Sequence, residues 1–533
     1  MNQRFLSNFI LFSFAAISLP AQANMEVLLE KLHKKGVLSD SEYQEMRAEA
    51  RQARRSAAIQ TAQETEHKEK RKAAEKKELT GKFNDGFSFT SGDGEHSIKL
   101  TGRVNADYRF SDNDYSLESA GSNDRDSASI AEGFELRRAR LGISGKVYKD
   151  IGYEVQLNGV GSGPTVDTAL FNLGFYKPFQ FQAGRFKQPF SLEQLTSSNN
   201  IDFAERSYND QMVPSKKLGA MFHGEPMPGL TYAVSVFQEG FSEGSQDDGE
   251  GKRHAARLTA NFAQLAEIKD TVLHVGIAGV GGDYQVRPSQ SSQTDGAAET
   301  TTRATIVGFR SMNRGLSNVY RAQIGGQDLR AGGVGPRSGL QSETLVDVDQ
   351  KLLGLEFAAA RGPFKLQGEY VKADYDAVNP VVSAGDTQQR LEGDVKSYYL
   401  QAMWNITGEK WSDAYRSGAF SGIKPLQNFK PGSGWGAWQL GLRYSKFDAS
   451  DIAVTGSSSR EQSGALGSNA DYNDEVDSFG VGLNWILNPM MRFMLEYTET
   501  KFGGETLPLD VSTAGAKGID KEQLVSLRAQ FNF

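Results

Sequence analysis

Hydrophobic and polar residues alternate along many short stretches of the chain. Residues 97–110 read SIKLTGRVNADYRF, with apolar residues on one parity and polar residues on the other. The apolar set is Ile98, Leu100, Val104, Ala106, Tyr108 and Phe110, and the polar set is Lys99, Thr101, Arg103, Asn105, Asp107 and Arg109. A period of two residues predicts a β-strand with two unlike faces. Such a strand suits either a soluble sheet packed on a core or a membrane barrel with lipid outside and water inside.

The alternation returns from about Phe87 to the C-terminus in about sixteen segments, an even number as bacterial barrels require. Further apolar sets are Ala139, Leu141, Ile143 and Val147; Leu230, Tyr232, Val234 and Val236; and Met491, Phe493, Leu495 and Tyr497. Aromatic residues flank these sets near strand ends, as interfacial aromatic bands require. The opposite parity is polar in almost every segment, which leaves too few inward apolar residues for a soluble core. The pattern therefore predicts an all-β fold, a transmembrane antiparallel β-barrel of about 16 strands.

The first residues have the form of a secretory signal peptide. Arg4 precedes an apolar run from Phe9 to Leu19, and Ala21-Gln22-Ala23 offers a small-x-small cleavage site. We expect residues 1–23 to be removed on export; a short anchor helix is the alternative, but the run is short for one. No other run of about 18 apolar residues occurs, so the mature chain can cross a membrane only as a barrel.

Residues 24–80 are of a different kind, rich in Ala, Glu, Lys, Arg and Gln, and are expected to be helical. Gly36 suits the end of a first helix, and Ser39–Glu42 has the form of a capping box for a second. Tyr43, Met46, Ala50, Ala53 and Ala57 recur at steps of three and four residues. This pattern fits a narrow coiled-coil seam or a single solvated helix. We expect a periplasmic spacer or trimer-associated helix here, followed by the barrel at residues 87–533.

Composition narrows the chemistry. The chain has no Cys, which excludes disulfides, thiolate catalysis and Cys-based metal sites. Its six His residues form no closely spaced pair, so we expect no metal site and no cofactor. A formal charge of −7 argues against nucleic acid as a partner. The segment Gly159–Pro164 is rich in Gly but lacks a following Gly-Lys-Ser/Thr, so it indicates a turn rather than a phosphate loop.

The longest insert in the first half of the chain is a candidate for narrowing the pore. Lys187 to Lys216 contains apolar residues that an external loop would expose to solvent: Phe190, Leu192, Leu195, Ile201 and Phe203. We expect this segment to fold inward against the barrel wall, because selectivity in a wide barrel requires a constriction. An ordered external loop at a trimer contact is the alternative.

The chain resembles the phosphate-selective porins of the O/P type. The resemblance runs through IKLTGRVNADY, ELRRARLGISGKVY, QAGRFKQPFSLEQLTSSNNIDFAER, YYLQAMWNITGE, GIKPLQNFKPGSGWGAWQLGLRYS and GVGLNWILNPMMRFMLEY to the terminal Phe533. It implies a homotrimer of sixteen-stranded barrels in the outer membrane of a Gram-negative bacterium. It also implies a narrow central site that holds phosphate.

Site residues follow from the same resemblance. The matching positions are Arg137, Arg138, Asp167, Ser197, Ser198, Arg206 and Arg492, whereas Gln194 stands where the family has a lysine. A guanidinium fork can bind two phosphate oxygens, and Asp167 could accept a hydrogen bond from a phosphate hydroxyl that sulfate and chloride lack. Arg137 and Arg138 are adjacent, so only one faces the lumen of a regular strand unless a bulge turns both inward.

Other arginines on the polar parity could line the lumen or lead anions toward the site. Lumen candidates are Arg103, Arg109, Arg257, Arg443 and Arg528. The insert from Asp283 to Asp349 carries Arg287, Arg303, Arg310, Arg314, Arg321, Arg330 and Arg337, spaced more widely than the arginine ladder of the family.

We therefore expect a porin for passive uptake of inorganic phosphate, with outer-membrane lipid around it, and no enzyme. A porin for polyphosphate, sulfate or small carboxylates is a second hypothesis. It is favoured by Gln194, which stands in place of a lysine of the family, and by the wide spacing of the arginines in the insert from Asp283 to Asp349. A third is a structural tether in which residues 24–80 contact the cell wall and the barrel is mainly an anchor.

Overall fold

The computed structural model describes residues 19–75, 79–83, 86–111, 114–116, 127–129, 132–161, 163–239, 251–286, 289–295, 297–315, 319–324, 345–378, 388–455, 473–506 and 519–533. Most of the expected signal peptide lies outside these residues. Contacts divide the chain into a helical unit, Met1–Thr80 with Ser91–Gly94, and a barrel unit, Gly81–Thr90 with Glu95–Phe533.

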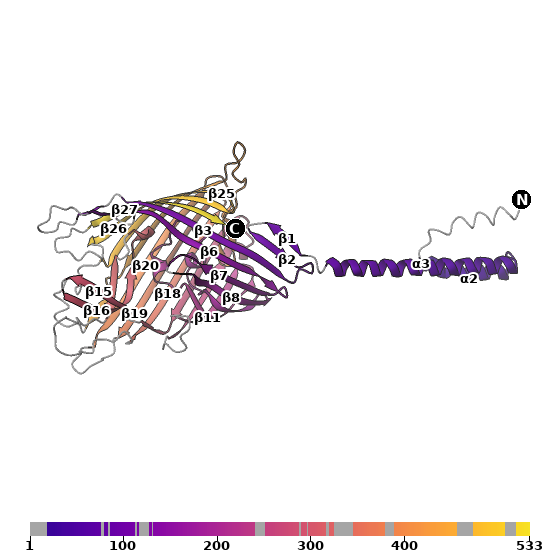
Figure 1. Ribbon diagram of the computed structural model, residues 1–533, viewed down its shortest axis with the longest axis horizontal. Helices are drawn as coiled ribbons and strands as arrows, with labels where there is room; N and C mark the ends of the chain where they lie inside the picture. The colour runs from indigo at the N-terminus through magenta and orange to yellow at the C-terminus, as the bar shows by residue number, and fades with distance from the viewer. Residues whose placement is uncertain are drawn as a thin grey trace. The chain divides into compact units, whose positions relative to one another are not determined.

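The barrel unit is a closed antiparallel β-barrel of 16 strands within the described residues (Figure 1). The strands are β3 (Ser97–Ser111), β6 (Gly133–Val147), β7 (Ile151–Asn158), β8 (Thr165–Tyr176), β9 (Phe179–Lys187), β10 (Lys216–Met227), β11 (Leu230–Gln238), β12 (Lys252–Asn261), β13 (Thr271–Gly281), β18 (Val346–Arg361), β19 (Phe364–Val378), β20 (Arg390–Asn405), β23 (Ala437–Asp448), β25 (Glu475–Asn488), β26 (Met491–Thr506) and β27 (Ile519–Asn532). The last strand pairs with the first, since β27 is antiparallel to β3. The barrel expected from the alternating pattern is thereby confirmed.

Shorter elements extend or fill the barrel. They are β1 (Thr80–Phe83), β2 (Phe87–Thr90), β4 (Asp114–Ser116), β5 (Ser127–Ser129), β14 (Asp283–Val286), β15 (Ser289–Asp295), β16 (Ala297–Phe309), β17 (Tyr320–Ile324), β21 (Tyr415–Arg416), β22 (Ala419–Phe420), β24 (Ala453–Thr455), α4 (Leu192–Leu195), α5 (Phe262–Leu265), and the 3-10 turns η2 (Tyr208–Gln211), η3 (Met312–Arg314) and η4 (Trp411–Ala414).

The two ends of the barrel differ in their connections. Short turns such as residues 148–150, 362–363 and 489–490 join strands at one end, together with the longer segment 406–436, and the other long inserts lie at the opposite end. Bacterial barrels place short turns in the periplasm and long loops outside, so we call these the periplasmic end and the outer end. The chain enters the barrel at the periplasmic end, because Phe87 pairs with Leu100 near the start of β3.

The outer face of the barrel carries the apolar parity. Its exposed side chains include Val104, Leu141 and Leu355. Aromatic rings stack near both strand ends: Trp438 on Trp485 at 5.3 Å and Phe364 near Trp404 at 6.1 Å toward the periplasmic end, and Tyr398 near Tyr444 at 6.0 Å toward the outer end. These are the two interfacial bands of a membrane barrel. No helix among the described residues is long and apolar enough to span a membrane.

The expectation of a polar inner face is wrong in the outer part of the lumen. The inner face of β18 to β25 carries buried apolar residues there, such as Val346, Val371 and Phe447. The hairpin of β16 and β17 packs on them, with Phe309 stacked on Phe447 at 4.1 Å. The insert that the sequence suggested as a funnel therefore also forms a small apolar core inside the barrel.

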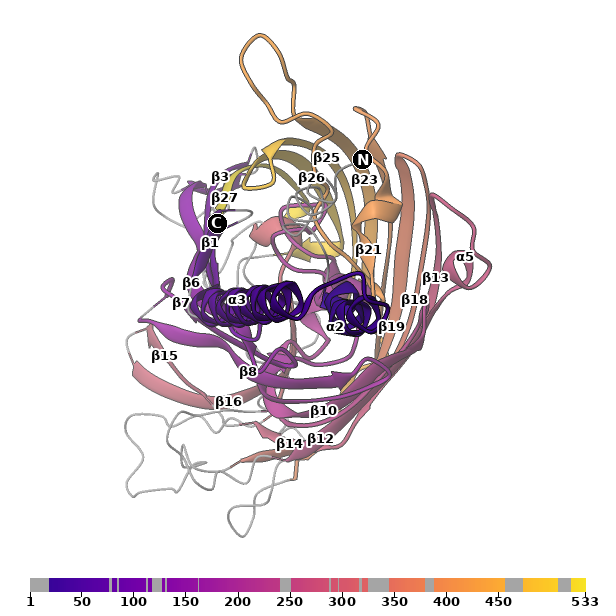
Figure 2. The same cartoon turned by 90° about the vertical axis from the view of Figure 1, so that its right-hand side faces the viewer.

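A second inward fold comes from the periplasmic end. Residues 406–436, between β20 and β23, bring η4, β21 and β22 against the wall (Figure 2). Trp411 Nε1 donates to the carbonyl of Pro363 over 3.1 Å, and the ammonium of Lys365 lies 3.9 Å from the centre of the Trp411 ring. Tyr415 shares a 2.7 Å hydrogen bond with His274. These contacts hold the segment inside the barrel, where it narrows the periplasmic side.

The helical unit contains α2 (Leu19–Lys34) and α3 (Asp40–Glu75), which confirms the helical segment expected before the barrel. The capping box is present: the backbone N–H and the hydroxyl of Ser39 donate to Glu42 Oε2 over 3.0 and 2.7 Å. These two hydrogen bonds, the backbone one first, lower the pKa of Glu42. His33 stacks on Tyr43 at 4.4 Å. The coiled-coil seam along α3 stays a prediction.

Candidate functional site

The segment between β9 and β10 folds into the lumen and narrows it. Phe190, Leu192 and Phe203 are all buried, as their apolar character predicts. Glycines on the inner wall make room for the rings: a Cβ on Gly354 would stand 2.7 Å from the Phe190 ring, and one on Gly441 would stand 3.0 Å from that of Phe203. We call residues 188–215 the constriction loop.

Carboxylates of the wall hold the backbone of this loop. Glu369 of β19 accepts from the N–H groups of Leu192 and Glu193 at 3.0 and 2.6 Å. Glu496 of β26 accepts from the N–H of Ala204 at 2.8 Å. The loop is thus fixed through its backbone to two separate strands of the wall.

A β-bulge turns two adjacent arginines inward. Asn105 pairs with Arg138 and the next residue, Ala106, pairs with Leu136, so Arg137 is an extra residue in β6. Arg137 donates to both carboxylate oxygens of Glu205 over 2.7 and 3.0 Å. Arg138 lies 3.8 Å from the same carboxylate. Both arginines therefore face the constriction loop, which regular alternation would forbid.

Glu205 is the point where the loop meets these cations. Besides the arginines of β6, Arg528 of β27 donates to it over 2.8 Å. Burial alone would raise the pKa of this loop carboxyl, but the positive charges of Arg137 and Arg528 hold the pKa well below its usual range. Glu205 is therefore a permanent anion that fixes the loop to the arginine-bearing wall.

Polar residues of β3, β6 and β8 next to this contact have donors without partners. Arg103 pairs across the strands with Arg140, and Asn105 with Arg138. Among the described residues, the buried Nε of Arg103 and of Arg140, Nη1 of Arg138, the side-chain amide of Asn105 and the hydroxyl of Thr168 have no hydrogen-bond partner. We call Arg103, Asn105, Arg138, Arg140 and Thr168 the arginine patch. A buried donor without a partner is costly, so this patch is suited to bind an anion.

Asp167 lies beside the patch and is itself paired with cations. A register shift in β8 between the partners of Gln156 and Leu157 makes Asp167 an extra residue. Arg140 contacts its Oδ2 at 3.0 Å, and the ammonium of Lys216 donates to the same atom. Both of these contacts are with Oδ2, and the other carboxylate oxygen, Oδ1, is a hydrogen-bond acceptor. Asp167 therefore places a carboxylate acceptor beside the donors of the patch.

The other residues expected at the site are divided between the patch and the scaffold. Ser198 accepts from Arg103 at the patch, whereas Ser197 accepts from the N–H of Asn199 at 3.3 Å within the loop. Arg206 donates to the carbonyls of Glu193 and Thr196, each over 3.0 Å, so it braces its own loop.

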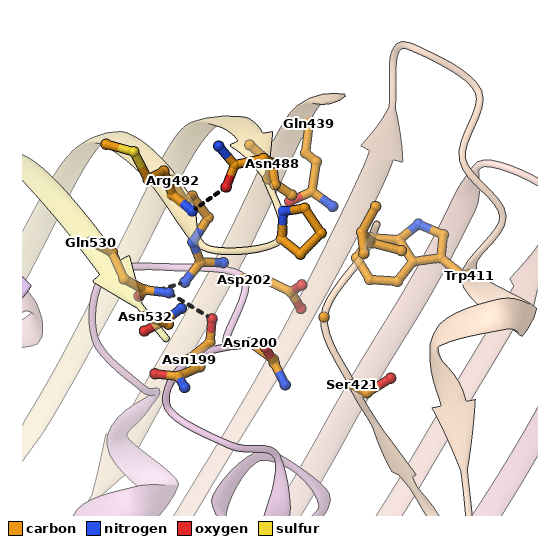
Figure 3. A pocket seen from close by; sticks show the side chains of 15 residues that line it. Asn199, Asn200, Asp202, Trp411, Ser421, Gln439, Asn488, Arg492, Gln530 and Asn532 are labelled. Atoms are coloured by element: carbon orange, nitrogen blue, oxygen red, sulfur yellow. Dashed lines mark hydrogen bonds between the residues drawn. The ribbon is translucent and has the colours of Figure 1, made fainter. Parts of the chain in front are cut away.

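Arg492 lies away from the patch. It donates to the carbonyl of Ile201 over 2.9 Å and to Gln530 over 3.1 Å. Figure 3 shows it among amide side chains at a separate pocket.

Most further arginine candidates are paired with carboxylates. Arg443 donates to Glu496 over 3.2 Å, Arg528 to Asp107 over 2.7 Å, Arg257 to Glu356 over 2.9 Å, and Arg109 contacts Glu135 at 2.6 Å. These arginines line the lumen wall, but their charges are largely compensated.

The insert brings part of its arginine series inside the barrel. Arg314 of η3 donates to Glu135 over 2.8 Å, and Arg310 stands at the end of the inward hairpin. Arg321 belongs to β17, and Arg303 to β16, where its side chain is outside the described part. Arg287, Arg330 and Arg337 lie outside the described residues.

Sequence reasoning missed Arg140, Asn105, Thr168 and Lys216 as members of the site. Parity could have found Arg140, because it follows Arg138 at a distance of two residues on the same strand. Thr168 and Lys216 gave no such signal, since only the register of β8 and the approach of β10 bring them to Arg140 and Asp167.

Known proteins resemble the chain along most of its length. A family model described as phosphate-selective porin O and P matches residues 98–306 and 335–533. Porin O of Pseudomonas aeruginosa is 24% identical over 430 residues, covering 79% of this chain and 86% of that protein. An uncharacterised protein of Caulobacter vibrioides is 23% identical over 433 residues, covering 78% of this chain and 71% of its own. Among solved structures, OmpT, an outer membrane protein of Vibrio cholerae, matches 82% of this chain and 98% of its own with a TM-score of 0.43 and 11% identity.

Proposed function

The chain belongs to the family of phosphate-selective porins O and P, and we propose that its arginine patch is where the passing anion is held. As a member of this family it is an outer-membrane porin of a Gram-negative bacterium, an anion-selective channel through which phosphate enters passively. Members of the family are channels, and we assign the chain no catalytic step.

The unpartnered donors of the arginine patch carry this proposal. Arg103, Arg138 and Arg140 each have a buried guanidinium N–H without a partner among the described residues. A phosphate oxyanion would satisfy these donors with charge-assisted hydrogen bonds. The hydroxyl of Thr168 and the amide of Asn105 add donors without adding charge.

Charge around the patch favours an anion without trapping it. The cations around the patch are Arg103, Arg137, Arg138, Arg140, Lys216 and Arg528, and the carboxylates that pair with them are Asp107, Asp167 and Glu205. The excess is positive, so the anion is attracted, and Asp167 weakens the attraction enough for release. Its Oδ1 atom can accept from a phosphate hydroxyl, which chloride and sulfate lack.

We further propose how the rest of the chain is used. Residues 1–23 are a signal peptide, residues 24–80 are a helical segment in the periplasm, and residues 87–533 are the porin, which assembles as a homotrimer. The entry of the chain at the periplasmic end supports the second assignment. Contact of residues 24–80 with the cell wall is a further proposal.

Reversal potential across a potassium chloride gradient tests the anion selectivity of the patch. The wild-type channel should be anion-selective, and a variant with Arg138→Gln and Arg140→Gln should lose much of that selectivity because two cations of the patch are gone. Arg390→Gln, an exposed arginine at the outer end, is the matched control and should behave as wild type. Equal reversal potentials in the double variant and the wild type would show that the patch does not determine the anion selectivity.

A further inference from the structure

A second polar pocket lies on the periplasmic side of the constriction loop. Its walls come from the tip of that loop, from residues 406–436, from β23 and from β25 to β27. The cavity between them has a volume of about 40 Å³. Figure 3 shows Arg492, Gln530, Asn532 and Asn199 on one side, with Trp411 and Ser421 on the other.

Amide side chains dominate this pocket. Asn199, Asn200, Gln439, Asn488, Gln530 and Asn532 surround the single cation, Arg492. The carboxylate of Asp202 also faces the pocket, but Lys365 and Gln401 each donate to it over 2.6 Å. Arg492 is therefore the charge that a solute would meet.

The unpartnered atoms of the pocket are of two kinds. Arg492 is 7% exposed, and its Nε–H has no partner among the described residues, although its other nitrogens donate to Ile201 and Gln530. The buried Oδ1 atoms of Asn199 and Asn532 are acceptors that likewise lack a partner there. A solute that satisfies all three must accept one hydrogen bond and donate others.

We propose that this pocket is a second binding station, specific for a small oxyanion that carries its own hydroxyl group. The charged oxygen of such an anion accepts from Arg492, and its hydroxyl donates to the amide oxygens of Asn199 or Asn532. Hydrogen phosphate has both features, whereas sulfate has no hydroxyl at neutral pH. A neutral polyol has hydroxyls but no charge for Arg492.

The strand register connects this pocket to the arginine patch. Arg138 pairs with Asn105, Asn105 with Gln530, and Gln530 with Arg492. The two arginines are thus three strands apart, or about 14 Å around the wall. An anion that leaves the patch meets the second station after passing the loop tip at Ser198 and Asn199. The inference rests on the proposed function in that the solute is taken to be the anion that the patch admits.

Anomalous diffraction from crystals of the full-length porin tests the pocket directly. Arsenate carries a hydroxyl at neutral pH as phosphate does, and selenate lacks one as sulfate does. Arsenate should give a peak at Arg492 between Asn199 and Asn532, and selenate should give none there. A selenate peak of equal height, or no arsenate peak at this pocket, overturns the proposal. A peak at the arginine patch in the same crystals separates failure of the pocket from failure of the proposed function.

Channel block gives a second readout that does not depend on crystals. In Arg492→Met, about tenfold more phosphate on the periplasmic side should be needed to block the chloride current, because one charge-assisted contact is lost. Asn532→Ala should reduce the preference for phosphate over sulfate about tenfold, because a hydroxyl acceptor is lost. Arg416→Gln is the matched control, since this exposed arginine lies in the same periplasmic segment outside the pocket. An unchanged preference in Asn532→Ala contradicts the role given to the hydroxyl.

Discussion

The lumen arginines differ in what their guanidinium groups already hold. Arg528 donates to Asp107 and Glu205, and Arg443 donates to Glu496 and the carbonyl of Glu205. Such arginines position the constriction loop. Arg138 has only a 3.8 Å contact with Glu205, and its Nη1 is without a partner among the described residues. Arginines of this second kind have hydrogen-bonding capacity left for a passing anion.

Asp167→Asn should slow the release of anions and weaken discrimination. The change frees Arg140 and Lys216 from their shared carboxylate and removes the acceptor for a phosphate hydroxyl. We expect longer single-channel block events with phosphate and with sulfate. The preference for phosphate over sulfate should fall about tenfold. Asp283→Asn, at an exposed position of β14, is the control. Shorter block events in Asp167→Asn would contradict this role.

Glu205→Gln should increase anion selectivity by the same amount at pH 7 and pH 5. The pKa of Glu205 is depressed, so its charge and its contacts with the arginines are fully present above the ordinary carboxyl pKa, and they are lost only as pH falls through the lower folded value. Reversal potentials of variant and wild type in potassium chloride give the difference at each pH. A difference that disappears at pH 5 would show that Glu205 is already protonated there.

At the scale of elements, two bulges and one set of glycines determine the site. The extra residue in β6 turns Arg137 and Arg138 to the same side, and the extra residue in β8 brings Asp167 beside Arg140. The sequence indicated a possible bulge in β6 only because two arginines are adjacent there. It could not place the bulge in β8, because the position of a bulge depends on strand register and not on local composition.

Gly354→Ala should destabilise the docked constriction loop. The new Cβ would lie 2.7 Å from the ring of Phe190, which is fully buried. We expect a loss of about 1–3 kcal/mol in the free energy of unfolding, the usual cost of overpacking. Urea unfolding in detergent measures it. Gly480→Ala is the control, since the nearest atom to its Cβ would be 3.6 Å away; an equal loss there would mean that loop docking is not involved.

At the scale of the molecule, alternation was enough to predict the barrel and its apolar outer face, because lipid imposes one requirement on every outward residue. The inner face has no such uniform requirement. The apolar lining around Val371 and Phe447 is covered by the hairpin of β16 and β17, and the periplasmic side is narrowed by residues around Trp411. Both depend on contacts between distant segments, so local periodicity could not reveal them.

Deletion of residues 24–75 should leave the conductance and the phosphate block of each pore unchanged, because the barrel unit has its own internal contacts. Planar-bilayer recording of the truncated porin measures both. Loss of trimers on native gels would identify the helices as a stalk, and a detached envelope with unchanged uptake would identify them as a tether. A changed block constant in intact trimers would contradict the independence of the pore.

Phosphate block of chloride current through single trimers is the most direct measurement of the central claim. With the wild-type porin, micromolar to millimolar phosphate should reduce the chloride current as the anion occupies the arginine patch. A variant carrying Arg103→Gln, Arg138→Gln and Arg140→Gln should need far more phosphate for the same block while remaining a folded channel. If the triple variant is blocked at the same phosphate concentration as the wild type, the patch does not hold the anion.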